Sequence, residues 1–101
     1  MEISYDPAKD EKNIRERGLS FEQARLFDFE TAVVLVDDRH EYGEIRYRAF
    51  GELDGRLHVL VFTMRGETVH VISLRRANKR EVKRYGHTQA CEGRSGTSRR
   101  R

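Results

Sequence analysis

The stretch that decides the fold is Leu57-His-Val-Leu-Val-Phe-Thr-Met64, Arg65-Gly-Glu67 and Thr68-Val-His-Val-Ile-Ser73. Its first segment is rich in β-branched and aromatic residues, as buried strands are. Its last segment alternates, with Val69 and Val71 on one face and His70 and Ile72 on the other. The three residues between the two segments form a tight turn. We therefore expect an antiparallel hairpin at the centre of a sheet.

Two more strands are expected upstream of this hairpin. Asp54-Gly55 is a strong hairpin turn. Before it, Ile45, Tyr47 and Ala49 alternate with Glu44, Arg46, Arg48 and Phe50, which is typical of a half-exposed strand. Residues 31–36, TAVVLV, form a continuous apolar strand. The sequence thus predicts a four-stranded antiparallel meander.

Helix signals flank the meander. Glu2 to Tyr5 forms a short strand, and Asp6-Pro7 then opens a helix that runs to Arg17 and ends at Gly18. Ser20 and Gln23 have capping-box spacing and start a second helix ending near Asp28, whose core stripe is Phe21, Ala24 and Phe27. Asn78 and Glu81 start a last helix, to Tyr85 and Gly86. We expect an α+β fold with its helices on one side of the sheet.

Charge is distributed unevenly along the chain. Its 101 residues, net charge +3, fit one domain, which we place at residues 1–86, followed by a basic, disordered tail at 87–101. Residues 1–74 hold 10 Lys/Arg and 15 Asp/Glu, whereas residues 75–101 hold 10 and 2, which favours a polyanionic partner for the C-terminal quarter. Cys91 stands alone, no apolar run could span a bilayer, and no secretory leader opens the chain, so we expect a cytoplasmic protein.

The clearest chemical feature is a basic segment with six Lys/Arg and one acid in ten positions from Arg75. On a helix, one arc would carry Arg76, Lys79, Arg80, Lys83 and Arg84, opposite Asn78, Val82 and Tyr85. Such a stripe can bind phosphate through guanidinium groups. The alternative is that the stripe is simply exposed to solvent, or that acidic residues of the same chain neutralise its charge.

Three other side chains are candidates. His70, near the start of the basic segment, titrates near neutral pH and could exchange protons, although it could equally be a sheet-surface histidine. Glu44 is a candidate base beside Arg46, or simply its ion-pair partner. Arg65 stands at a hairpin tip. Neither metal-ligand spacing nor a glycine-rich phosphate loop is present, so no metal or other cofactor is expected.

Along residues 2 to 85 the chain resembles the BrnT family of toxins. The matching segments are Tyr5-Asp-Pro-Ala-Lys9, Asn13, Gly18-Leu-Ser-Phe-Glu-Gln-Ala24, Phe27-Asp-Phe-Glu-Thr-Ala32, Gly43-Glu-Ile-Arg-Tyr47 and Val71 to Tyr85. The resemblance implies a RelE-like fold and metal-independent cleavage of RNA by attack of a 2′-hydroxyl on phosphate. It also implies that the protein inhibits translation and that a BrnA-type ribbon-helix-helix antitoxin neutralises it. The toxin would then contact operator DNA only through this antitoxin.

The resemblance also suggests roles for individual residues. Arg75, Arg76 and Arg80 match the basic motif of the family and are expected to bind and stabilise the phosphate, and Tyr85 matches too, although it also fits core packing. To this catalytic set we add Arg65 from the hairpin and two candidate general bases, His70 first and Glu44 second. Lys79, Lys83 and Arg84 are expected to bind RNA. His70 stands where many relatives have arginine, and Arg17 where relatives often have histidine. The first departure keeps an alternative open: a degenerate toxin that has lost cleavage and acts only as an antitoxin-binding partner or co-repressor.

Overall fold

The computed structural model describes residues 1–39 and 41–86. Its elements are β1 (Ile3–Ser4), α1 (Pro7–Arg17), the 3₁₀ helix η1 (Phe21–Leu26), β2 (Val33–Val36), β3 (Tyr47–Leu53), β4 (Arg56–Arg65), β5 (Thr68–Arg76), α2 (Lys79–Glu81) and the π-helical turn η2 (Val82–Gly86). The predicted tail, which contains His87 and Cys91, lies outside the described residues, as does His40. No helix among the described residues is long and apolar enough to cross a membrane.

The five strands form one sheet in the order β1-β5-β4-β3-β2. Strands β2 to β5 pair antiparallel in succession, which confirms the meander, and β1 pairs parallel with β5. The expected turns are present, since Asp54 and Gly55 have φ values of 55° and 78° and Gly66 has a φ of 64°. These positive values explain why small or turn-forming residues stand there.

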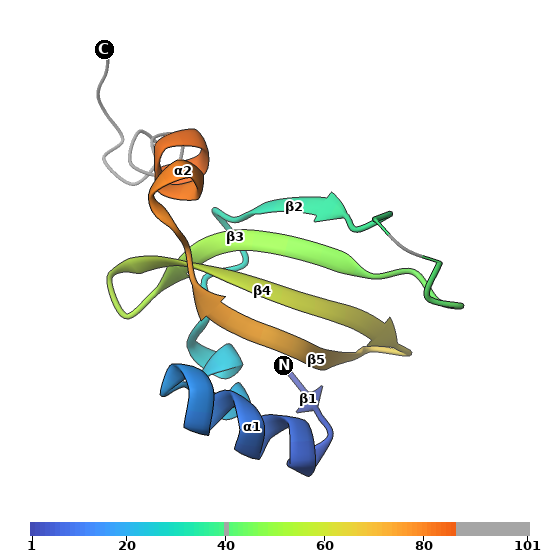
Figure 1. The fold of residues 1–101 in the computed structure, drawn as a ribbon. Coiled ribbons are helices and arrows are strands. Elements are labelled where there is room, and N and C mark those ends of the chain that lie inside the picture. The colour runs from blue at the N-terminus through green and yellow to red at the C-terminus, as the bar shows by residue number, and fades with distance from the viewer. Residues whose placement is uncertain (40, 87–101) are drawn as a thin grey trace.

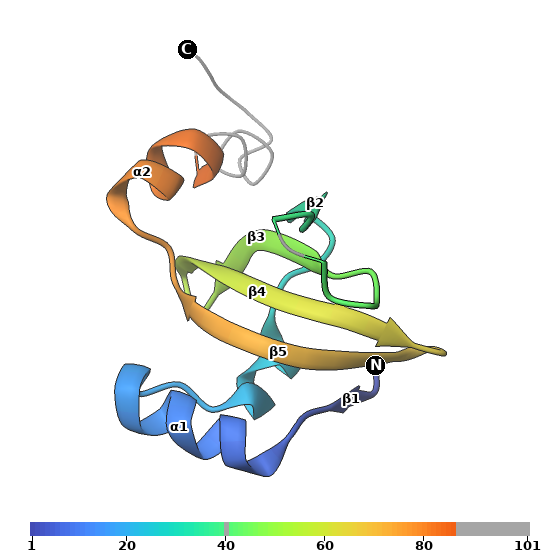
Figure 2. The same cartoon turned by 45° about the vertical axis from the view of Figure 1, so that its right-hand side comes forward.

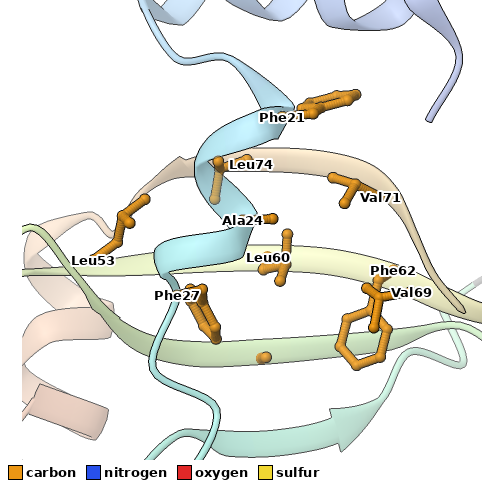
Figure 3. Packing of buried hydrophobic residues seen from close by; sticks show 10 residues of the cluster. Phe21, Ala24, Phe27, Leu53, Leu60, Phe62, Val69, Val71 and Leu74 are labelled. Carbon is orange, nitrogen blue, oxygen red and sulfur yellow. The ribbon is translucent and has the colours of Figure 1, made fainter. Parts of the chain in front are cut away.

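The core lies between one face of the sheet and the segment that contains η1 (Figure 3). Phe21, Ala24 and Phe27 point onto the sheet, as the stripe predicted. They meet inward-facing residues of the central strands, namely Ala49, Leu53, Leu60, Phe62, Val69, Val71 and Leu74. Gly51 leaves room for this contact, because a Cβ there would lie 2.7 Å from Phe27 Cζ.

The second predicted helix differs in detail. It is a 3₁₀ helix that ends at Leu26 rather than near Asp28, and Leu26 is 73% exposed. The Ser20 side chain accepts from the Glu22 amide, so the predicted capping box with Gln23 does not form. In the tighter winding of a 3₁₀ helix, residues three apart lie on one side, which still directs Phe21, Ala24 and Phe27 together onto the sheet.

Helix α1 begins and ends as predicted, with Asp6 accepting from the Ala8 amide and Gly18 in a left-handed conformation at its end. It is anchored by a polar residue rather than an apolar one. Asn13, only 6% exposed, donates from Nδ2 to the carbonyl oxygens of Leu19 and Leu74, at 2.9 Å each. These two hydrogen bonds connect α1 to the loop that follows it and to β5.

The helices do not all lie on one side, so that prediction was wrong. In Figures 1 and 2, α1 and η1 cover one face of the sheet while α2 lies on the other. The reason is the packing of Tyr85, whose ring stacks on Phe50 at 4.0 Å between centroids. Phe50 follows core-facing Ala49 in β3 and therefore faces away from η1.

Strand β5 is longer than predicted and ends at Arg76 instead of Ser73. A register shift at Val61/Phe62 sets Phe62 against Val71 and Val61 against Ser73. This extra residue changes the alternation, so that buried Leu74 joins Val71 on the core face. Arg75 consequently faces the same side as Phe50, the open face of the sheet.

Candidate functional site

The open face is the side of the sheet turned away from α1 and η1. Cross-strand pairing places on it a row formed by Phe50, Val59 and Arg75, and a second row with Arg48 and Val61. His70 pairs with Thr63 farther along the same face. The segment of α2 and η2 covers only the end near Arg75 (Figure 2). Near His70, Thr63 is only 3% exposed and donates to the carbonyl oxygen of Ile45, so the segment before β3 covers part of the other end.

Arg75 and Glu81 form a bidentate ion pair. Arg75 Nη1 and Nη2 each donate to a carboxylate oxygen of Glu81 at 2.8 Å. Glu81 Oε1 also accepts from the Asn78 amide at 2.9 Å, and Asn78 Oδ1 accepts from the Glu81 amide at 2.8 Å, which completes the predicted capping box. The contact lowers the pKa of Glu81, chiefly through the hydrogen bonds from Arg75, and raises that of Arg75. Glu81 therefore stays ionised and positions α2 against β5.

A small hollow adjoins this ion pair. It has a volume of about 140 Å³ and is lined by Arg48, Phe50, Arg80, Glu81, Arg84 and Tyr85. The Tyr85 ring closes one side by stacking on Phe50, and Arg84 Cζ lies 5.7 Å from the Tyr85 centroid. Tyr85 is only partly buried and lies outside the core between the sheet and η1, and its predicted catalytic role stays a prediction.

His70 lies at a second centre on the open face. Its Nδ1 is 2.8 Å from Ser4 Oγ, on the neighbouring strand β1. Partial burial is the main cause that lowers the pKa of His70, and the nearby positive charge of Arg65 lowers it further, against the opposing effect of Glu44. The imidazole is therefore neutral at neutral pH and chemically able to accept a proton. Arg65 and Glu44, two other predicted residues, thus lie close enough to His70 for their charges to act on it.

The loop after β2 is held by its own ion pairs. Arg39 donates twice to buried Asp37, at 2.6 and 2.8 Å, and these bonds hold the pKa of Asp37 at about 2. Farther along, Arg46 Nε donates to Glu44 at 3.3 Å and the Arg46 guanidinium lies 4.0 Å from the Tyr42 ring centroid. The predicted ion pair of Glu44 and Arg46 is present, and it limits how freely Glu44 can act as a base.

The two centres are separated along the sheet. His70 pairs with Thr63 and Arg75 pairs with Val59, four residues apart on β4. At the rise of a strand this separation is about 13 Å. A single phosphate group cannot bridge it, so the structure does not gather all the predicted residues around one phosphate.

The basic residues of the C-terminal segment also lie in different places rather than along one helical stripe. Arg76 is the last residue of β5, where alternation points it away from Arg75, so the predicted helical arc does not include it. Lys79, Arg80, Lys83 and Arg84 are exposed on α2 and η2. Arg17 lies on the helix-covered side, where it donates to Asn13 and Ser73.

Three contributors were not identified from sequence: Ser4, Arg39 and Arg48. Arg48 could have been found, because the alternation of β3 places it beside Phe50 on the face opposite Ala49. Ser4 had no local signal because its partner His70 comes from a strand distant in the sequence, whereas Arg39 pairs with Asp37 only two residues away. Within residues 1–39 and 41–86 no group of three or more His, Cys, Asp or Glu side chains could hold a metal ion.

Comparison with known proteins identifies a family and a similar solved structure. Residues 5–81 match the family described as the ribonuclease toxin, BrnT, of type II toxin–antitoxin systems. The 1.1 Å crystal structure of the Brucella abortus ribonuclease toxin, BrnT, superposes with a TM-score of 0.62 at 30% identity, covering 78% of this chain and 99% of that one. No curated protein sequence matches the chain.

Proposed function

Because the chain belongs to the BrnT family of ribonuclease toxins of type II toxin–antitoxin systems, we propose that it cleaves RNA on the open face of its sheet without a metal ion. The observation that carries this proposal is the setting of His70. A neutral imidazole lies beside the cation Arg65, on the same face as the arginines near α2. A base and positive charge along one surface are what phosphate transesterification by acid–base catalysis requires.

In this proposal His70 Nε2 removes the proton from the attacking ribose 2′-hydroxyl. A hydrogen bond from Nδ1–H to Ser4 Oγ would fix the tautomer that leaves the Nε2 lone pair free. The 2′ oxygen bonds to phosphorus, the bond to the 5′ oxygen breaks, and the 5′ oxygen takes a proton from water, so that the products are a 2′,3′-cyclic phosphate and a 5′-hydroxyl. His70 then releases the proton that it removed to solvent. Arg65 stabilises the charge on the phosphorane. Glu44 is the second candidate base.

The arginines near α2 serve binding rather than proton transfer. The carboxylate of Glu81 is occupied by Arg75 and by the Asn78 amide, and its lowered pKa makes it a poor base. Arg75 in turn uses two donors on Glu81, which leaves its other N–H groups for phosphate. Arg80, Lys79, Lys83 and Arg84 would hold the RNA backbone by charge, whereas Arg76 points away from the open face.

A type II toxin has a protein antitoxin. We propose a BrnA-type antitoxin with a ribbon-helix-helix domain, so that operator DNA is reached only through the complex. We also propose that the fold is RelE-like and that the toxin inhibits translation in the cytoplasm. The match to the family of ribonuclease toxins supports these proposals.

Product ends provide the test. Purified protein is incubated with a defined RNA in EDTA, beside the same RNA carrying a 2′-deoxy sugar at the cleavage position. Cleavage that leaves 2′,3′-cyclic phosphate ends, and that stops at the 2′-deoxy position, is the expected result. Cleavage of the 2′-deoxy substrate, or cleavage restored only by adding Mg²⁺, would refute the chemistry. A protein that binds RNA and cuts neither substrate would favour the degenerate toxin.

A further inference from the structure

The hollow between β3 and η2 holds positive charge that its own residues do not neutralise. Its single acid is Glu81, and Glu81 is already paired bidentately with Arg75. Arg48, Arg80 and Arg84 form no salt bridge with any of residues 1–39 and 41–86. Glu81 also interacts electrostatically with Arg48, but its single carboxylate, already paired with Arg75, cannot balance the three guanidinium groups of Arg48, Arg80 and Arg84.

Arg48 is the most informative of the three. Its Nε is buried and has no hydrogen-bond partner within the described part of the chain. Its register neighbours on β2 and β4 are Leu35 and Val61, whose side chains offer no acceptor. A buried N–H group without an acceptor is costly. A ligand oxygen entering the hollow would remove that cost.

From these contacts we propose that the hollow is a binding site for one RNA backbone phosphate, distinct from the phosphate that reacts at His70. This proposal rests on the proposed function. Arg48 would bind from the floor, with Arg80 and Arg84 at the rim, because forked N–H donors match phosphate oxygens. Since the hollow adjoins Arg75, about 13 Å along the sheet from His70, its phosphate belongs to another nucleotide of the same strand.

A consequence for substrate length follows. A dinucleotide with a single phosphate can occupy the reaction centre or the hollow, but never both. A hexanucleotide can occupy both sites at once. The hollow therefore contributes to binding of the longer substrate alone and acts as a subsite that favours longer single strands.

The test uses Arg48→Gln and Arg84→Gln, with Arg15→Gln as the matched control, because Arg15 carries the same charge and is 68% exposed but lies on α1, away from the hollow. Two readouts are combined. The first is the dissociation constant for a fluorescent all-2′-deoxy hexanucleotide, which cannot react through a 2′-hydroxyl. The second is kcat/KM for a diribonucleotide and a hexaribonucleotide. Thermal melts establish that each variant is folded, and Arg84, being exposed, tests the proposal even if Arg48→Gln is unstable.

Loss of one charge-assisted contact should weaken hexanucleotide binding about tenfold. It should also reduce the slope of log affinity against log salt by roughly 0.7. The dinucleotide should be cut at the wild-type rate. The proposal is overturned if Arg15→Gln weakens binding as much as Arg84→Gln, or if dinucleotide cleavage falls as far as hexanucleotide cleavage. Binding of the unreactive strand tests the subsite even if the wild type cuts nothing, which separates its failure from that of the proposed function.

Discussion

The ion pair between Arg75 and Glu81 should hold the C-terminal segment onto the sheet, and a double-mutant cycle measures how strongly. The perturbations are Arg75→Ala, Glu81→Ala and the double variant. The pair has two hydrogen bonds of 2.8 Å, with side-chain exposures of 35% for Arg75 and 17% for Glu81. Exposed pairs contribute about 0.2–1 kcal/mol, whereas hydrogen bonds to charged groups contribute about 1.5–3 kcal/mol. Because solvent screens Arg75 in part, we expect a coupling energy of about 1–2 kcal/mol.

Urea unfolding followed by circular dichroism gives the free energies for this cycle at pH 7. The pKa of Glu81 is lowered in the folded state, so its contribution is present above the unfolded pKa and is lost as pH falls through the folded pKa. The coupling should therefore disappear in acid. A coupling near zero at pH 7, or one that persists once Glu81 is protonated, would refute the role given to this pair. Glu81→Ala alone also removes the bond to the Asn78 amide, so it should destabilise more than Arg75→Ala.

Three further predictions concern the fold and the proposed base. Gly51→Ala should lower the free energy of unfolding by about 1–3 kcal/mol, measured in urea, because the added Cβ would lie 2.7 Å from Phe27 Cζ. The control is Gly43→Ala, whose added Cβ would have nothing within 4 Å. This control is itself unfavourable because Gly43 has a φ of 80°, so it measures the loss of a glycine without a clash. Asn13→Ala should lower the free energy of unfolding by about 1–3 kcal/mol, because the carbonyl oxygens of two residues lose their donor. A loss of stability no larger than that of Ile14→Ala, at an exposed position of the same helix, would contradict this. As the pH is lowered, cleavage should persist below pH 6.5 and fall only when His70 takes up a proton, because burial, Arg65 and Lys9 lower the pKa of His70 more than Glu44 and Asp6 raise it; a rate that already falls before the pH has dropped to 6.5 would contradict the assignment.

Much of the fold follows from local chemistry that a sequence displays. Asp6, Gly18, Asp54-Gly55 and the pair of Asn78 and Glu81 end or start elements through their own backbone or near neighbours. Such signals need no tertiary information, which is why the boundaries of α1 and the hairpin turns were predicted correctly. The 3₁₀ winding of η1 was not, because it depends on how three side chains meet a sheet that forms later.

The candidate site was less predictable because it depends on one extra residue in β5. The register shift places Arg75 on the open face and ends the strand at Arg76, whereas a helical reading had joined Arg76 to Arg80. The pairing of Arg75 with Glu81, and the hollow beside it, exist only once α2 crosses to the open face. The sequence identified the right kind of residues, yet it could not divide them between two centres.

The most direct measurement of the central claim is the single-turnover rate of RNA cleavage in EDTA by wild type and by His70→Ala. The account predicts a rate lower by about 10²–10⁴-fold in the variant, with hexanucleotide binding unchanged, since general base catalysis contributes that much. A His70→Ala protein that is folded and cuts at the wild-type rate would contradict the account and would move the base elsewhere on the open face, first of all to Glu44.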